Sequence, residues 1–133
     1  MKRSDPRDNE VLVKLERPFM DERGAIQPLV ERVMKSALVI SSKEGAVRGN
    51  HYHNTDWHYC YVVSGTMYYF HRGTGSLSKP EKVIVKAGSM VFTPPMVDHA
   101  MKFPEDTVFL CLSRNERDQT AYEKDVIRVE LLK

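Results

Sequence analysis

Hydrophobic residues in this chain fall into many short runs that are separated by turn residues. Glycines and prolines, such as Gly24, Pro18 and Gly65, mark the ends of several runs. Short runs with turns between them are typical of an all-β sandwich or barrel. The predicted strands cover residues 10–16, 25–33, 36–41, a strand that carries His51 and His53, 57–63, 66–71, 82–86, 90–93, 99–103, 107–112 and 126–132. We therefore predict a small, single-domain β-barrel.

Two regions depart from this strand pattern. Residues 1–9 are polar, and we expect them to form a flexible N-terminal arm, which leaves residues 10–133 as the barrel domain. Residues 114–125 are rich in charge, and we expect them to hold about one turn of helix. No other segment has a sustained helical period.

Composition narrows the possible partners and surroundings. The chain has 133 residues, of which 41% are hydrophobic, enough for one buried core. Its 20 basic and 18 acidic residues include no basic block, so we predict no nucleic-acid partner. No run approaches the length of a membrane span, so we expect no membrane partner and a cytoplasmic location. Cys60 and Cys111 lie inside apolar runs and are expected to be reduced core residues.

Three of the five histidines lie close together in the sequence. His51 and His53 are two residues apart, so on a strand their side chains project from the same face. His58 follows at the start of the next apolar run. A histidine pair on one strand, with a third just past a turn, can converge on one metal ion. Imidazole suits zinc, copper, iron and nickel.

The spacing of these histidines resembles the first sequence motif of the cupin superfamily. Gly45, His51, His53 and Gly65 match that motif, and His58 stands where cupins usually carry a glutamate. The resemblance implies a jelly-roll barrel, also described as a double-stranded β-helix.

A segment further along the chain resembles the second cupin motif. Gly88, Pro94 and His99 match it, whereas Met96 replaces the usual glycine and Phe103 the usual asparagine. The two motifs together extend the resemblance over about residues 45–112.

The resemblance implies that four histidines line one pocket and hold a divalent metal. The predicted ligands are His51, His53, His58 and His99. Because His58 replaces the only carboxylate of the usual set, the identity of the metal (zinc, iron, nickel or copper) stays open. The alternative is that these polar residues line a ligand cavity without a metal.

Arg48 precedes this cluster at a position suited to substrate binding. Gly49 allows a close turn of the backbone, which leaves Arg48 near the mouth of the same pocket. A guanidinium there suits a bidentate contact with phosphate or carboxylate. The alternative is a surface arginine in an ion pair.

A narrower resemblance concerns cupins that act on nucleotide-linked keto-sugars. The Arg-Gly-x-His pattern at 48–51, with Asp-Glu-Arg-Gly at 21–24 and the segment 41–45, is similar to dTDP-4-dehydrorhamnose 3,5-epimerases and dTDP-sugar 3,4-ketoisomerases. The fuller string Arg-Gly-Asn-His-Tyr-His at 48–53 is more similar still to the C-terminal cupin domain of capsular polysaccharide synthesis proteins. Residues 122–128 are similar to the end of the ketoisomerases.

This narrower resemblance implies a nucleotide-sugar substrate in surface polysaccharide synthesis and proton transfer next to a ketone. It makes His51 the base and Arg48 a substrate-binding group, and it implies a homodimer. A tyrosine would return a proton; the candidates are Tyr59, Tyr61, Tyr68 and Tyr69. A metal-bound His51 could not also act as the base.

Two other functions remain open at the level of sequence. One is a metal-dependent cupin dioxygenase that acts on a small molecule. The other is a non-catalytic sugar-binding or metal-binding cupin module. The 21–24 and 48–51 segments favour the sugar-nucleotide enzyme, because neither is needed by an oxygenase.

Overall fold

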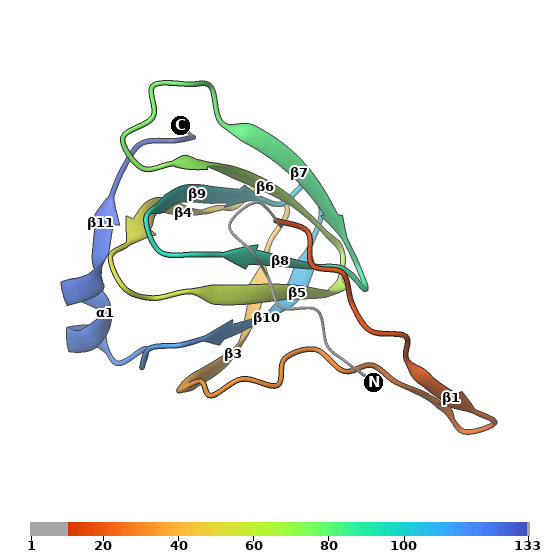
Figure 1. Cartoon of the computed structure of the whole chain (residues 1–133). Helices are drawn as coiled ribbons and strands as arrows, with labels where there is room; N and C mark the ends of the chain where they lie inside the picture. The colour runs from red at the N-terminus through yellow and green to blue at the C-terminus, as the bar shows by residue number, and fades with distance from the viewer. Residues whose placement is uncertain (1–10, 133) are drawn as a thin grey trace.

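Two antiparallel sheets face each other and form an open-ended barrel (Figure 1). The computed structural model describes residues 11–132, so the arm predicted over residues 1–9 lies outside the described residues. One sheet has the order β3 (Ser36–Ser42), β10 (Thr107–Ser113), β5 (His58–Ser64), β8 (Met90–Thr93). The other has the order β11 (Val126–Arg128), β4 (Val47–His53), β9 (Val97–Lys102), β6 (Thr66–Gly73), β7 (Glu81–Lys86). The predicted all-β barrel is confirmed.

A hairpin and a short helix complete the fold. The hairpin consists of β1 (Phe19–Asp21) and β2 (Gly24–Ile26) and projects away from the barrel (Figure 1). The helix α1 (Gln119–Asp125) lies at one end of the barrel beside β11, within the stretch where a turn of helix was predicted. The Asp118 side chain caps it by accepting a hydrogen bond from the backbone N–H of Ala121, at 3.1 Å.

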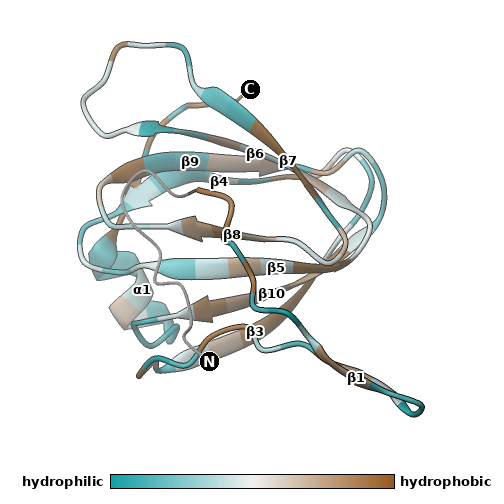
Figure 2. Ribbon diagram, turned by 45° about the vertical axis from the view of Figure 1, so that its right-hand side comes forward, coloured by the Kyte–Doolittle hydropathy of each residue, from teal (hydrophilic) through white to brown (hydrophobic). Residues whose placement is uncertain are grey.

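The core lies between the two sheets because side chains alternate along each strand. On β10, Thr107, Phe109, Cys111 and Ser113 are buried, whereas the residues between them are partly exposed. Figure 2 shows apolar segments along β8, β10 and part of β5, and the largely hydrophilic helix α1 at the end of the barrel. The buried core cluster comprises Cys60, Val62, Met67, Tyr69, Val85, Val91, Met101, Phe103, Phe109 and Cys111.

A second apolar cluster packs residues of the four-stranded sheet against the N-terminal segment. Its buried members are Trp57, Tyr59, Met90 and Phe92. Apolar residues from the segment 13–34 pack against them. The guanidinium of Arg32 lies 4.1 Å from the centre of the Trp57 ring. Tyr59 therefore lies on the face of β5 opposite to that of Cys60, which lines the interior of the barrel.

Three predicted strands are shorter in the structure than in the sequence pattern. Within the segment predicted as the first strand, Leu12 forms only an isolated bridge with Val91. The strand predicted over residues 25–33 is limited to β2, because Pro28 lacks a backbone donor and restricts the conformation of the residue before it. The strand predicted over residues 126–132 is β11, which ends at Arg128.

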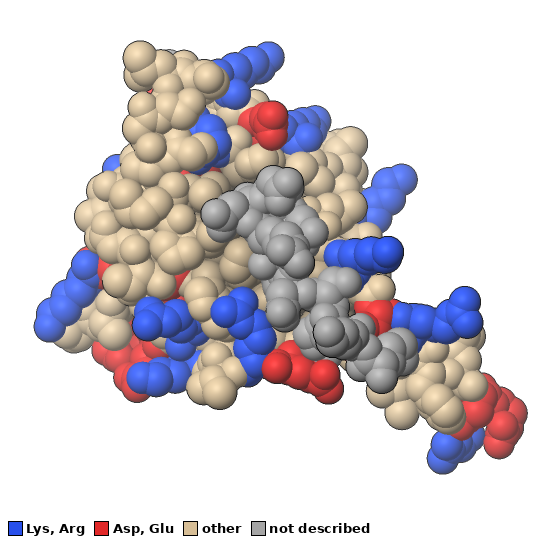
Figure 3. Space-filling view, viewed as in Figure 1, with Lys and Arg blue, Asp and Glu red and all other residues tan. Residues whose placement is uncertain are grey.

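Charged side chains of both signs stand side by side on the face shown in Figure 3. Basic and acidic groups alternate around α1 and on the projecting hairpin, so this face presents no continuous basic surface. Within residues 11–132, no helix is long and apolar enough to span a membrane.

Gly65 connects β5 to β6 where only a glycine fits. Its φ is +90°, and an added Cβ would lie 2.5 Å from the Asp106 carbonyl oxygen and collide with the Thr107 hydroxyl. We expect Gly65→Ala to lower the free energy of unfolding by roughly 2–4 kcal/mol, from backbone strain and steric overlap together. Urea unfolding provides the measurement.

Gly75→Ala is the matched control for this prediction. Gly75 has a similar φ of +87°, but an added Cβ would meet nothing within 4 Å. The control therefore reports the strain alone. Equal losses of stability in the two variants would contradict the steric argument.

Candidate active site

A bulge in β4 aims its histidines into the barrel. The pairing of β4 with β9 shifts register between Gly49 and His51, and Asn50 has a φ of +58°. Gly49 makes the close approach possible, since a Cβ there would lie 2.9 Å from the His99 carbonyl oxygen. After the bulge, His51 lies directly opposite His99 on the neighbouring strand.

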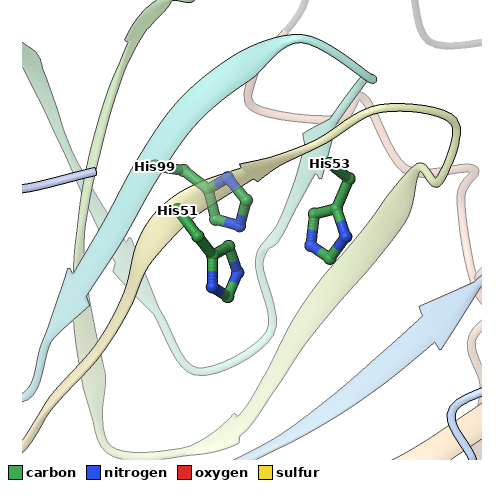
Figure 4. Close-up of side chains that lie close together, drawn as sticks. All are labelled: His51, His53 and His99. Atoms are coloured by element: carbon green, nitrogen blue, oxygen red, sulfur yellow. The ribbon is translucent and has the colours of Figure 1, made fainter. Parts of the chain in front are cut away.

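The structure brings the predicted histidines together. Figure 4 shows His51 and His53 on β4 and His99 on β9, with their rings close to one another. One ring nitrogen from each of these three lies within 4.8 Å of the others. His58 lies beside the group, with its Nε2 3.3 Å from the Nε2 of His99. The assignment of all four as metal ligands stays a prediction.

These rings line a cavity of about 330 Å³. Three arginines, Arg48, Arg117 and Arg128, also line it, as does Tyr122 of α1. The Tyr122 ring centre is 6.2 Å from that of His51 and 6.0 Å from that of His53. The cavity therefore combines neutral imidazoles, a phenol and several cations.

Sequence reasoning missed Arg117, Tyr122 and Arg128 as cavity residues. The similarity of residues 122–128 to the ketoisomerases was the only signal that pointed to this region. No periodicity marks these side chains, because Arg117 lies in the loop between β10 and α1, whereas the pairing of β11 with β4 brings Arg128 and the neighbouring helix to the cavity.

The four tyrosines named from sequence do not line the cavity. Tyr59 belongs to the second apolar cluster, and Tyr61 packs against that cluster. The hydroxyl of the buried Tyr69 shares a hydrogen bond of 2.6 Å with the Thr93 hydroxyl. Tyr68 packs under the Lys82 ammonium group, 4.0 Å from its ring centre. Tyr122 is the tyrosine among the described residues that lines the cavity.

Arg48 is held at the cavity by hydrogen bonds to β3 of the other sheet, and no ion pair of Arg48 is found within residues 11–132. Its Nε donates to the Ser42 hydroxyl at 2.7 Å, and its Nη2 donates to the Ser41 carbonyl oxygen at 3.0 Å. These contacts fix the guanidinium beside the entrance.

Asp125, the last residue of α1, ties the helix to the loop that follows His53. Its carboxylate accepts hydrogen bonds from the backbone N–H groups of Thr55 and Asp56, at 2.9 and 3.0 Å. One of its oxygens lies 3.6 Å from the Nδ1 of His53. Asp125 therefore positions both the loop and the histidine.

Burial keeps the histidines neutral. Loss of water is the main cause, and repulsion by His99, if it were protonated, and by Arg117 adds to it. Together they lower the pKa of His51 to about 2 and that of His53 to about 3. Burial also lowers the pKa of His99 to about 4, and it lowers the pKa of His58 well below the ordinary value. Neutral imidazoles retain a lone pair for a metal ion or a proton.

The donor set fits a divalent metal. Among the described residues, the buried Nδ1 of His51 and the Nε2 of His53 have no hydrogen-bond partner, whereas the Nδ1 of His53 faces the Asp125 carboxylate. Unpaired buried nitrogens are costly, and a ligated metal would satisfy them.

The family model described as Cupin domain matches residues 38–113, more than half of the chain. The chain belongs to the cupin family. A search of curated protein sequences found no match.

Several solved cupin structures share this fold. QdtA, a sugar 3,4-ketoisomerase from Thermoanaerobacterium thermosaccharolyticum in complex with TDP, has a TM-score of 0.74 at 19% identity, covering 92% of this cupin and 90% of QdtA. The dTDP-4-dehydrorhamnose 3,5-epimerase from Sulfolobus tokodaii has a TM-score of 0.69 at 16% identity, covering 86% and 80%. CapF, a capsular polysaccharide assembling protein from Staphylococcus aureus, has a TM-score of 0.65 at 22% identity, covering 89% of this cupin and 35% of CapF. With sequence identities of 16–22%, the structural similarity to these proteins shows a shared fold.

The neutral histidines make stability depend on pH. Unfolded histidines titrate near 6.5, whereas the folded values are about 2 for His51, 3 for His53 and 4 for His99. The unfolded chain therefore binds more protons below pH 6.5. We expect stability without metal to fall as the pH drops from 6.5 toward 4, by about 1.4 kcal/mol per pH unit for each such histidine.

Urea unfolding between pH 7 and 5, with a chelator present, measures this loss. We expect His53→Asn to reduce the slope, because it removes one titrating group. A free energy of unfolding that stays constant over this range would contradict the assignment of buried neutral rings.

Proposed function

We propose that this cupin is an epimerase or ketoisomerase of a nucleotide-linked keto-sugar, serving surface polysaccharide synthesis. The observation that supports the proposal is the cavity, which is lined by the neutral imidazole of His51 together with Arg48, Arg117 and Arg128. A base next to several cations suits a substrate that has a ketone and a diphosphate. QdtA, which shares the fold, was solved in complex with TDP.

The arginines would bind the anionic part of the substrate. Guanidinium groups make strong, charge-assisted hydrogen bonds to phosphate oxygens. A volume of about 330 Å³ suits a sugar, with the nucleotide at the entrance.

Substrate binding would also strengthen His51 as a base. Burial is the main cause of its low pKa, and the charges of Arg117 and Arg128 lower it further. A bound diphosphate offsets those two charges, so the pKa of His51 rises in the complex. A general base works best with a pKa near the working pH.

Proton transfer would then follow a short path. His51 removes the proton from the carbon beside the carbonyl, which leaves an enolate. Burial raises the pKa of Tyr122, so its hydroxyl stays protonated and can donate. Return of a proton to the same carbon from the other face gives epimerisation. Delivery to the former carbonyl carbon, with a hydroxyl proton moving between the two oxygens, gives ketoisomerisation.

A divalent metal fits the same group of rings. His51, His53 and His99 would hold zinc, iron, nickel or copper, which supplies Lewis acidity to polarise a ketone oxygen. The His51 nitrogen that binds a metal cannot also accept the proton from carbon. The base role of His51 therefore belongs to the metal-free site.

We expect His51→Asn to abolish proton exchange at the carbon next to the ketone. Removal of a general base lowers such rates by about 10²- to 10⁴-fold. Proton NMR in D₂O measures the exchange, with TDP-4-keto-6-deoxyglucose, the ligand of one QdtA structure, as the first substrate and its UDP counterpart as the second.

His71→Asn is the matched control, since His71 lies outside the cavity residues. It should keep the activity of the unaltered protein. Exchange that proceeds equally in His51→Asn would remove His51 as the base, and no exchange with either nucleotide in the unaltered protein would refute the proposed function.

We expect Arg48→Gln to weaken the binding of TDP by about tenfold, which corresponds to about 1.4 kcal/mol. Isothermal titration calorimetry measures the affinity. Arg23→Gln, on the projecting hairpin, makes the same charge change away from the cavity and should leave the affinity unchanged. Equal weakening in both variants would mean that only net charge matters.

A further inference from the structure

Two cysteines and one histidine form a separate cluster in the wall of the cavity. Cys60 on β5 and Cys111 on β10 lie directly opposite each other in the strand register. His58 precedes Cys60 by two residues, so its side chain is on the same face of β5. All three are buried and line the cavity, and one donor atom from each lies within 4.8 Å of the others.

One distance in this cluster matches that between two donors of a coordinated metal. Zinc lies about 2.0–2.1 Å from imidazole nitrogen and about 2.3 Å from thiolate sulfur, which at a tetrahedral angle places the two donors about 3.5 Å apart. The Nδ1 of His58 lies 3.6 Å from the Sγ of Cys60. Small side-chain rotations would bring the third donor into range.

The cluster also has a suitable charge balance. Two thiolates and a neutral imidazole on a divalent ion make a neutral unit, which a buried site tolerates better than a net charge. Arg117 is already paired with the buried Asp56, at 3.4 Å. The Arg117 Nη2 lies 3.8 Å from the Sγ of Cys111, where it favours the thiolate.

We propose that His58, Cys60 and Cys111 form a second metal site, for a thiophilic divalent ion of the zinc class. Two thiolates and one imidazole leave the fourth position of the ion to a ligand from the cavity. The site does not depend on the proposed sugar chemistry.

The second site uses different atoms from the three-histidine group. The Nδ1 of His58 faces Cys60, whereas its Nε2 faces His99 at 3.3 Å. His51, His53 and His99 take no part in it. The two donor sets can therefore be tested separately.

Titration of the reduced protein with Co²⁺ tests this proposal. Cobalt takes the geometry of zinc, and its bond to thiolate gives a near-ultraviolet charge-transfer band that imidazole ligands do not give. We expect this band to saturate at one equivalent in His53→Ala, where the three-histidine group is broken. We expect Cys60→Ser and Cys111→Ser each to lose most of it.

A second measurement on the unaltered protein covers the case in which the cysteine variants fail to fold. We expect Zn²⁺ to protect both thiols from an alkylating reagent, with the modified residues identified by mass spectrometry. Absence of the cobalt band together with unprotected thiols would overturn the proposal. A band that survives in both folded cysteine variants, or a Cys60–Cys111 disulfide that withstands reduction, would also overturn it.

Discussion

The pairing of β4 with β9 is the constraint on which the rest of the site depends. Gly49 lets the two backbones approach so closely that a Cβ would lie 2.9 Å from a carbonyl oxygen. The bulge that follows sets His51 opposite His99 and leaves His53 on the same side. On its other edge β4 pairs with β11, and this pairing brings the C-terminal segment to the cavity. One strand thus positions both the histidines and the groups that surround them.

Burial gives the histidine group its chemical character. Loss of water holds the pKa of His51, His53 and His99 at about 2, 3 and 4, so the rings stay neutral where they lie close together. Protonation of one ring would place a charge beside the others and beside the arginines. The same neutrality leaves the lone pairs available to a metal ion or to a substrate proton. Arg48, Arg117 and Arg128 then supply the positive charge that the imidazoles lack.

His58 links two different donor sets in one barrel. Its Nε2 faces the imidazole of His99, and its Nδ1 faces the thiol of Cys60. An imidazole ring has nitrogens on two sides, so it can face a histidine and a cysteine at once. A glutamate, which has no such ring, could not do so. The replacement of that carboxylate therefore changes more than the ligand count. It gives the wall of the cavity two nitrogen donors at the position where cupins usually carry a glutamate, next to the sulfur of Cys60.

The sequence by itself determined the all-β barrel and the residues that gather at its centre. Alternation sets which face of a strand is buried, and the spacing of two motifs identified His51, His53, His58 and His99, because both signals are local to a strand. The same signals failed for the strand predicted over residues 10–16, in whose described part Leu12 forms a single bridge, and they did not find Tyr122, the tyrosine that lines the cavity. Tyr122, Arg117 and the opposed Cys60 and Cys111 were decided only by the tertiary structure. Their contacts join segments far apart in the chain, and the register of the strands that carry them is set by the packing of the whole barrel.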